Sequence, residues 1–211
     1  MRYPTPYRDL IRPAAEDQGI DESWVYGITR QESRFMHYAK SGVGASGLMQ
    51  LMPATAKWIA KRAGVINYHN GMIKELGTNV ALGTYYLRYT LELMNDQAVM
   101  ATAAYNAGPS RAKKWMANVP LEGAIYAETI PFNETRSYVQ KVMANAHIYA
   151  HRLGLKSHSL KLRLGIIPAN GSSYIADGER INSQKIVVPS QENETSLTAQ
   201  PTAISPSELA Q

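Results

Sequence analysis

Apolar residues recur at intervals of three and four positions along the first three quarters of the chain. Such spacing is typical of amphipathic helices, and no alternating apolar pattern of strand length occurs before residue 155. Asp21 and Asn133 suit N-caps, and Pro53 suits a first helical turn. We therefore expect a mainly α fold, with helices over residues 21–35, 53–64, 79–94 and 97–105, a helix from 109 through Trp115 and Met116, and a last helix over 133–153.

The pattern changes after Gly154. Residues 155–188 contain two β-prone pieces, LKLRLGII and KIVV, separated by turn signals. They could form a hairpin, which is stable in water only when it packs on another part of the fold. Of the 23 residues from 189 to 211, 17 are Pro, Ser, Thr, Gln, Asn or Glu. Such a segment cannot bury enough apolar surface to offset the entropy of ordering it. We expect a helical domain over residues 1–154, a β-prone extension over 155–188 and a disordered tail over 189–211.

Composition excludes several kinds of chemistry. The 211 residues contain no cysteine, which excludes disulfides, thiolate nucleophiles and cysteine-bound metal centres. The five histidines form no HExxH or HxH motif, so a histidine-built metal site is not expected. No run of about 18 apolar residues occurs, which argues against a membrane-spanning helix. Residues 1–10 also lack the apolar centre of a cleavable export signal.

The net charge of +5 is concentrated in the predicted helical domain. Residues 1–154 hold 17 Lys and Arg against 12 Asp and Glu, whereas residues 155–211 hold five of each. A basic surface favours an anionic partner such as nucleic acid, anionic lipid or an acidic cell-wall polymer. No nucleic-acid-binding motif surrounds the short basic clusters, so no nucleic-acid partner is expected. Substrate steering and simple solubility both remain open as explanations of this charge.

Glu32 is a candidate catalytic acid. Apolar residues lie four and seven positions before it and three after it, which places its carboxyl within the apolar stripe of a predicted helix. Burial raises the pKa of a carboxyl, and the negative end of the helix dipole acts in the same direction. Both effects prepare a protonated acid at neutral pH, which the departure of a sugar oxygen requires. The alternative is a structural ion pair with Arg30 or Arg34.

Two loops add candidate binding groups. SGVGASGLMQLMP, at residues 41–53, is rich in glycine, so its backbone can approach a ligand closely, and it presents Gln50 and Met52 just before a helix. AAYNAGP, at residues 103–109, places Tyr105 beside Asn106 at a helix end. An amide next to a phenol suits the N-acetyl or hydroxyl group of a sugar. Each loop taken alone is also explained by ordinary turn chemistry.

Four motifs in a fixed order resemble those of the soluble lytic murein transglycosylase family, in its C-terminal catalytic domain. They are QESRF at residues 31–35, GASGLMQLMPATA at 44–56, AAYNAGP at 103–109 and IPFNETRSYV at 130–139. The resemblance covers about residues 4–152. It implies a mainly helical, goose-lysozyme-like fold with a cleft for peptidoglycan strands. The large α-superhelical region that precedes this unit in the long members has no counterpart in residues 1–211, and residues after 154 do not match the expected ending.

The resemblance assigns roles to eight residues. Glu32 matches the single catalytic acid and base. The other matched positions are substrate-binding residues of the cleft, namely Ser41, Gln50, Met52, Tyr105, Asn106, Glu134 and Tyr138. The last two belong to the motif that completes the cleft and supports the catalytic glutamate. Glu128 lies near the last motif without an assigned role.

The implied reaction cleaves the bond between N-acetylmuramic acid and N-acetylglucosamine. Most glycosidases use two carboxylates, whereas here only Glu32 has the motif context of a catalytic acid. By resemblance, the substrate supplies the second group: the muramoyl 6-hydroxyl closes onto C1 and leaves a 1,6-anhydro end. No metal or cofactor is required.

Two alternatives stay open at this stage. A lysozyme-like hydrolase would cut the same bond with water, and a binding module would hold the glycan without cutting it. The expected partner is the peptidoglycan strand, the expected oligomeric state is a monomer, and the expected location is the periplasm or cell envelope.

Overall fold

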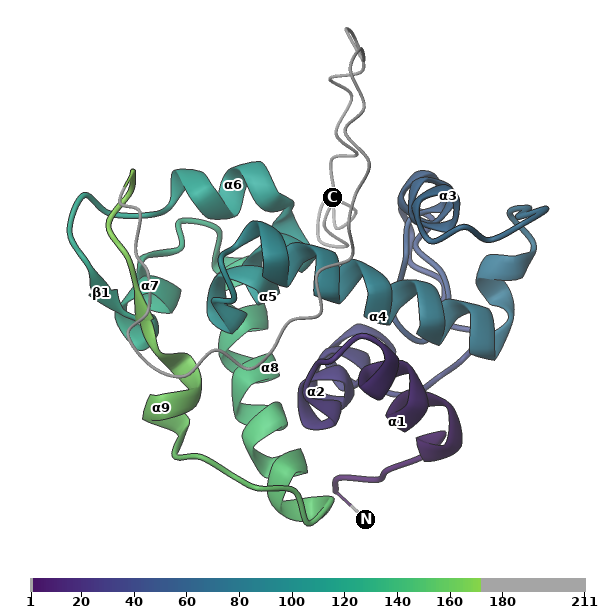
Figure 1. Ribbon diagram of the computed structural model, residues 1–211, viewed down its shortest axis with the longest axis horizontal. Helices are drawn as coiled ribbons and strands as arrows, with labels where there is room; N and C mark the ends of the chain where they lie inside the picture. The colour runs from purple at the N-terminus through teal and green to yellow at the C-terminus, as the bar shows by residue number, and fades with distance from the viewer. Residues whose placement is uncertain (1, 172–211) are drawn as a thin grey trace, which may run out of the picture.

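Helices α1 (Arg8–Asp17), α2 (Glu22–Ser33), α4 (Leu76–Leu93) and α8 (Asn133–Arg152) meet at the centre of the molecule. The computed structural model describes residues 2–171. Helix α2 lies between α1 and the long helix α8, and the second long helix, α4, crosses above them (Figure 1). The contact between α2 and α8 is the most extensive between any two helices of these residues.

Shorter elements surround this centre. They are α3 (Pro53–Arg62), the 3-10 helix η1 (Met72–Lys74), α5 (Ala98–Ala107), α6 (Pro109–Lys114), β1 (Leu121–Glu122), α7 (Gly123–Thr129), α9 (Leu160–Leu164) and β2 (Ile166–Ile167). The expected mainly α fold is therefore confirmed. Within residues 2–171, none of the helices combines the length and hydropathy needed to cross a bilayer.

Most predicted helices begin where their sequence signals placed them. Asp21 is the N-cap of α2, its side chain accepting a hydrogen bond from the backbone of Ser23 at 2.7 Å. Pro53 occupies the first turn of α3, and Pro109 that of α6. Local capping chemistry fixed these bounds, because each proline lacks an N–H that the first turn would leave without a partner.

Other boundaries differ from the predictions. Helix α2 ends at Ser33, and Phe35 lies beyond it with a positive φ of 68°. Asn133 is the first residue of α8, where Phe132 is the N-cap, and α6 ends before Trp115 and Met116. Helices α1 and α7 were not predicted. Both are short and take their stability from packing on larger helices rather than from a long periodic pattern.

The expected hairpin in residues 155–188 is wrong in its first part. LKLRL forms the short helix α9, capped by Ser159, whose hydroxyl accepts a hydrogen bond from the backbone of Leu162 at 3.3 Å. Only Ile166–Ile167 is a strand, and it pairs antiparallel with Leu121–Glu122 of the helical domain. The piece KIVV and residues 189–211 lie outside the described residues.

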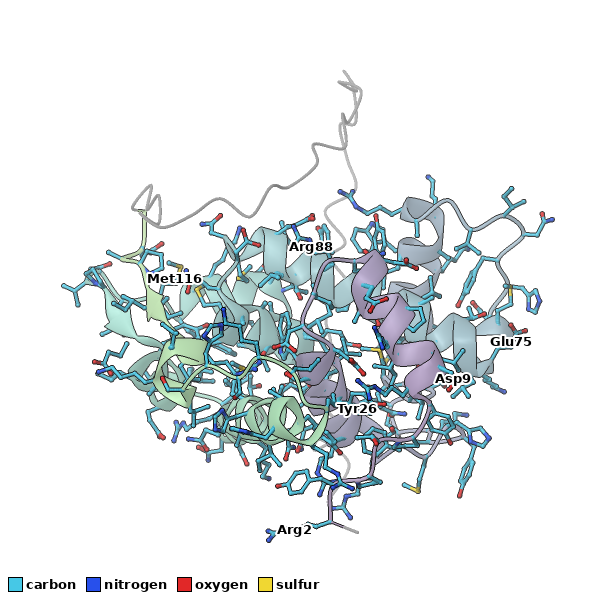
Figure 2. The ribbon with its side chains drawn as sticks, turned by 60° about the horizontal axis from the view of Figure 1, so that its bottom comes forward. Arg2, Asp9, Tyr26, Glu75, Arg88 and Met116 are labelled. Carbon is cyan, nitrogen blue, oxygen red and sulfur yellow. The ribbon has the colours of Figure 1, made fainter. Side chains whose placement is uncertain are left out.

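The molecule extends to both sides of the central helices. Glu75, next to the start of α4, and Met116, just after α6, lie at opposite sides of Figure 2. Close to the centre, Tyr26 of α2 packs its ring against Tyr149 of α8, with ring centroids 5.0 Å apart. Both side chains are fully buried. The junction between α8 and the helix that carries Glu32 is therefore part of the hydrophobic core.

Candidate active site

Glu32 occupies the last turn of α2, on the side that faces the protein. Ile28, one turn earlier, is fully buried, and Glu32 itself is partly exposed. The backbones of α2 and α8 approach closely at Gly27, where an added Cβ would lie 2.8 Å from the backbone oxygen of Val142. Only glycine permits this approach. The predicted position of Glu32 within the apolar stripe is confirmed.

A tyrosine from α8 binds the Glu32 carboxyl directly. The hydroxyl of Tyr138 donates a hydrogen bond of 2.6 Å to Oε1 of Glu32. Burial raises the pKa of Glu32 to about 8; the Tyr138 hydrogen bond opposes this rise, and the negative charge of Glu134 adds to it. Glu32 is therefore largely protonated at neutral pH, as a general acid must be before reaction.

The structure does not support the alternative that Glu32 forms a structural ion pair with Arg30 or Arg34. Among residues 2–171, the ion pairs do not include Glu32. The guanidinium of Arg30 lies 4.4 Å from the ring centroid of Tyr3, and Arg34 forms the exposed C-cap of α2. Without a cation beside it, the carboxyl keeps its raised pKa.

The chain reverses direction immediately after Glu32. Arg34 and Phe35 both adopt left-handed backbone conformations, with φ of 53° and 68°. Such conformations are costly for side chains with a Cβ and cluster at functional sites. The hydroxyl of Ser33 stabilises the turn: it donates to the carbonyl of Thr29 at 3.2 Å and accepts from the backbone of Phe35 at 3.1 Å.

The glycine-rich loop at residues 41–53 is held by side-chain hydrogen bonds. Gln50, with φ of 47°, donates its amide to the carbonyls of Ala39 at 3.0 Å and Gly47 at 2.7 Å. The hydroxyl of Ser41 accepts a hydrogen bond from the backbone of Ala45 at 2.9 Å. These contacts give both side chains a role in shaping the loop, and their contact with substrate remains a prediction.

Asn79 of α4 anchors the same loop and was not predicted as a site residue. Its amide donates to the carbonyls of Ser46 at 2.9 Å and Ile73 at 2.8 Å, and its carbonyl accepts from the backbone of Met49 at 2.9 Å. A side chain at Gly47 would collide with the Asn79 amide. The sequence places Asn79 at the start of a predicted helix. An asparagine at a position that a helix buries must find hydrogen-bond partners outside that helix, and this is the one feature that points to its role.

Tyr105 and Asn106 lie at the end of α5, as predicted. The Tyr105 hydroxyl donates to the carbonyl of Met49 at 2.9 Å, and Oδ1 of Asn106 accepts from the hydroxyl of Thr135 at 2.8 Å. Burial raises the pKa of Tyr105 well above its usual value, and the charge of nearby Glu32 adds to the effect. The pair thus joins the loop to α8 close to the catalytic candidate.

The remaining candidates take different positions. Met52 is a partly exposed residue at the N-terminus of α3, and Glu134 is close enough to Glu32 to influence its ionisation. Glu128 is exposed and accepts a hydrogen bond from Gln140 at 2.7 Å. The charge of Glu134, and not that of Glu128, is among the causes that raise the pKa of Glu32.

Glu32 does not line the cavity at the N-terminal end of α2. In the part of the chain that the structure describes, no group of three or more His, Asp or Glu side chains could hold a metal ion. A cavity of about 250 Å³ lies at the opposite end of α2, beside Asp21, Trp24 and Arg163.

The helical fold, with a protonated glutamate held at the end of a buried helix, places the chain in the lysozyme-like class. Comparison with known proteins identifies the family. The Transglycosylase SLT domain matches residues 9–125, and the soluble lytic transglycosylase helical domain matches residues 129–157. The chain belongs to the soluble lytic transglycosylase family, as its four motifs indicated.

Individual relatives agree with this assignment. The soluble lytic murein transglycosylases of Salmonella typhimurium and Escherichia coli K12 are 40% and 38% identical over 158 residues, which are 74% of this chain and 24% of each relative. The transglycosylase of phage PRD1 is 31% identical over 78% of this chain and 51% of its own length. The chain thus spans about a quarter of the length of the two bacterial relatives.

Solved structures show the same fold. An inactive glutamate-to-glutamine mutant of a lytic transglycosylase from Pseudomonas aeruginosa has a TM-score of 0.72 and 41% identity, covering 75% of this chain and 26% of that one. The 70-kDa soluble lytic transglycosylase of Escherichia coli has a TM-score of 0.69 and 35% identity, covering 78% and 26%. The lysozyme-like fold expected from the motifs is confirmed.

Proposed function

We propose that this chain is a peptidoglycan lytic transglycosylase that cleaves the β-1,4 bond between N-acetylmuramic acid and N-acetylglucosamine. The observation that carries this proposal is the carboxyl of Glu32, held by Tyr138 with a pKa raised to about 8. Protonated Glu32 donates its proton to the bridging oxygen as the bond from that oxygen to C1 breaks. The sugar that remains carries positive charge at C1.

The second half of the reaction uses the carboxylate left on Glu32. It accepts the proton of the muramoyl 6-hydroxyl while that oxygen bonds to C1, which closes the 1,6-anhydro ring and restores the acid. Tyr138 stabilises the transient carboxylate with its short hydrogen bond. Asn106 orients the N-acetyl group, Tyr105 supports the neighbouring loop, and Ser41, Gln50, Met52 and Glu134 line the cleft.

The names of the relatives support murein as the substrate, and one solved relative is inactive with a glutamate-to-glutamine change. A structure of the 70-kDa soluble lytic transglycosylase with bulgecin A adds a bound ligand for a relative at 36% identity. We propose that the chain acts as a monomer in the periplasm or cell envelope, where peptidoglycan lies.

In the decisive experiment, the chain digests purified peptidoglycan sacculi, and mass spectrometry measures the masses of the released fragments. Transglycosylation gives anhydro ends, whereas the hydrolase alternative gives fragments heavier by one water. Glu32→Gln is expected to lower the rate by about 100-fold to 10,000-fold, because it removes general acid–base catalysis. Glu128→Gln, a change at an exposed glutamate, serves as the matched control. Near-normal cleavage by Glu32→Gln, or reducing ends from the unmodified chain, would contradict the proposal.

A further inference from the structure

A line of aromatic rings connects the catalytic region with the surface of α3. Tyr105 contacts Tyr86 of α4 with ring centroids 5.2 Å apart, and Tyr86 stacks on Tyr89 at 6.3 Å. Tyr89 in turn meets Trp58 of α3 edge to face at 4.8 Å. Because the charge of Glu32 acts on Tyr105, the line begins beside the proposed catalytic acid.

Exposure increases along this line. Tyr105 and Tyr86 are buried, Tyr89 is partly exposed, and Trp58 leaves 37% of its surface open to solvent. Trp58 lies on α3, the helix that packs across α4 in Figure 1. The line therefore ends at a large, solvent-accessible ring at some distance from Glu32.

Arg62 supports the outer two rings. Its guanidinium lies 5.8 Å from the ring centroid of Trp58 and 5.2 Å from that of Tyr89, within the range of cation–π attraction. Among residues 2–171, the ion pairs do not include Arg62. Its charge is thus available to an anionic group that approaches the rings.

We propose that Trp58 and Tyr89, flanked by Arg62, form an outlying binding site for the glycan strand, distal to the two sugars at the cleaved bond. This inference rests on the proposed function. The C–H face of a sugar ring is apolar and packs on an aromatic ring, which removes apolar surface of both groups from water. The Arg62 guanidinium suits a carboxylate of the peptides that peptidoglycan carries.

Burial of the inner rings explains why only the outer part of the line binds sugar. Tyr86 is 7% exposed and Tyr105 is 6% exposed, so neither can offer a ring face to a ligand. They instead fix the position of Tyr89 relative to the glycine-rich loop, because the Tyr105 hydroxyl bonds the carbonyl of Met49. A distal site of this kind binds substrate and transition state equally, so it strengthens binding of long strands without changing the chemistry at Glu32.

Binding measurements on the Glu32→Gln variant, which is expected to cleave at least about 100-fold more slowly, test the site. The probes are a short and a long β-1,4-linked N-acetylglucosamine oligomer, measured by calorimetry. The long oligomer is expected to bind more tightly than the short one. Adding Trp58→Ala should weaken the long oligomer by about tenfold, the value of one lost stacking contact, and leave the short one unchanged.

Two control variants separate stacking from general damage. Trp58→Phe keeps a ring and should restore most of the affinity for the long oligomer. Ile66→Ala removes another hydrophobic side chain just beyond α3, 83% exposed, and should leave both affinities unchanged. Melting temperatures of all variants, compared with their parent, report whether Trp58 contributes only to the packing of α3 on α4.

The possible failures are distinct. If Trp58→Ala binds the long oligomer as tightly as its parent does, or loses affinity for both oligomers equally, the distal site is wrong and the proposed function stands. If the parent binds neither oligomer and the unmodified chain releases no anhydro ends from sacculi, the proposed function fails and the distal site fails with it.

Discussion

Asp21, at the N-cap of α2, and Glu32, in its last turn, are two carboxyl groups with opposite surroundings. Asp21, the N-cap, accepts hydrogen bonds from the backbone and hydroxyl of Ser23 and pairs with Arg163 of α9 at 2.7 Å. Glu32, in the last turn, has a tyrosine hydroxyl in place of an arginine and the negative charge of Glu134 nearby. The helix dipole favours negative charge at the first position and opposes it at the second.

The comparison shows how one helix can hold a structural and a chemical carboxyl. Asp21 accepts hydrogen bonds from Ser23 and pairs with Arg163, so it links the helical domain to the extension after residue 154. Burial without a cation makes Glu32 an acid that keeps its proton at neutral pH. The surroundings, more than the type of residue, separate the two roles, and each can be altered by single substitutions.

Among changes to the surroundings of these two carboxyls, Tyr138→Phe should have the largest effect on activity, because it removes the hydrogen-bond donor to Glu32. A hydrogen bond to a charged group contributes about 1.5–3 kcal/mol, so loss of the transient carboxylate's partner should lower kcat about 10-fold to 100-fold. The pKa of Glu32 should rise further, since this bond lowers it. Initial rates on sacculi against pH would show a slower enzyme whose alkaline decline begins at higher pH; an unchanged kcat would contradict the role of Tyr138.

Glu32→Gln should stabilise the fold at neutral and alkaline pH. The pKa of Glu32 rises on folding from an ordinary value of 4.5 to about 8, so the folded state resists ionisation that the unfolded chain accepts. The variant should match the parent below pH 4.5 and gain stability as the pH rises to about 8, on the order of 2 kcal/mol after allowance for the partial exposure of Glu32. Denaturant unfolding across this pH range measures the difference, and equal stability at every pH would disprove it.

Arg163→Met tests the other end of α2. The Arg163 side chain is 10% exposed, and its Nε is buried without a hydrogen bond among the described residues, a cost that the substitution removes. We expect a net destabilisation of about 1 kcal/mol and an unchanged pH profile of activity. Lys161→Met, which removes an exposed pair with Glu122, should have a smaller effect. A shift in the pH profile of Arg163→Met would mean that the two ends of α2 are coupled.

Glu134→Gln should have the smallest effect. Removal of its negative charge lowers the pKa of Glu32, because that charge raises it. The alkaline limb of the kcat/KM profile should move to lower pH by less than about one unit. Glu128→Gln is the matched control, since Glu128 is exposed and bonded to Gln140. Equal shifts in the two variants would indicate a general change of surface charge instead of a local one.

Short-range features of the site followed from the sequence. The spacing of Glu32 from Ile28 placed its carboxyl on the packed face, and the prolines at 53 and 109 marked helix starts. These features depend on residues within a turn or two of each other. The LKLRL segment shows where such reasoning fails: its alternation suggested a strand, but the Ser159 cap and packing on the helical domain give a helix.

Long-range contacts were accessible only through the resemblance or through the structure. Tyr138 lies 106 positions from the glutamate that it binds, and no local pattern relates the two. The resemblance related the motif that contains Tyr138 to the catalytic glutamate, but it did not predict their hydrogen bond. It also gave no indication of Asn79, which holds the glycine-rich loop from α4. Buried amides that satisfy backbone groups of a distant loop leave little trace in periodicity.

The close approach of α8 to α2 at Gly27 fixes the position of Tyr138 along α8 relative to Glu32. Val142 and Ala146, whose backbone atoms face Gly27, lie one and two turns after Tyr138 on the same side of α8. A slip of α8 by one turn would carry the phenol about 5.4 Å away from the carboxyl, and the tight seam at Gly27 leaves no room for it. The lack of a side chain at Gly27, more than one helical turn away, thus keeps the Tyr138 hydroxyl aligned with the Glu32 carboxyl. The hydrogen bond is in place before any glycan binds.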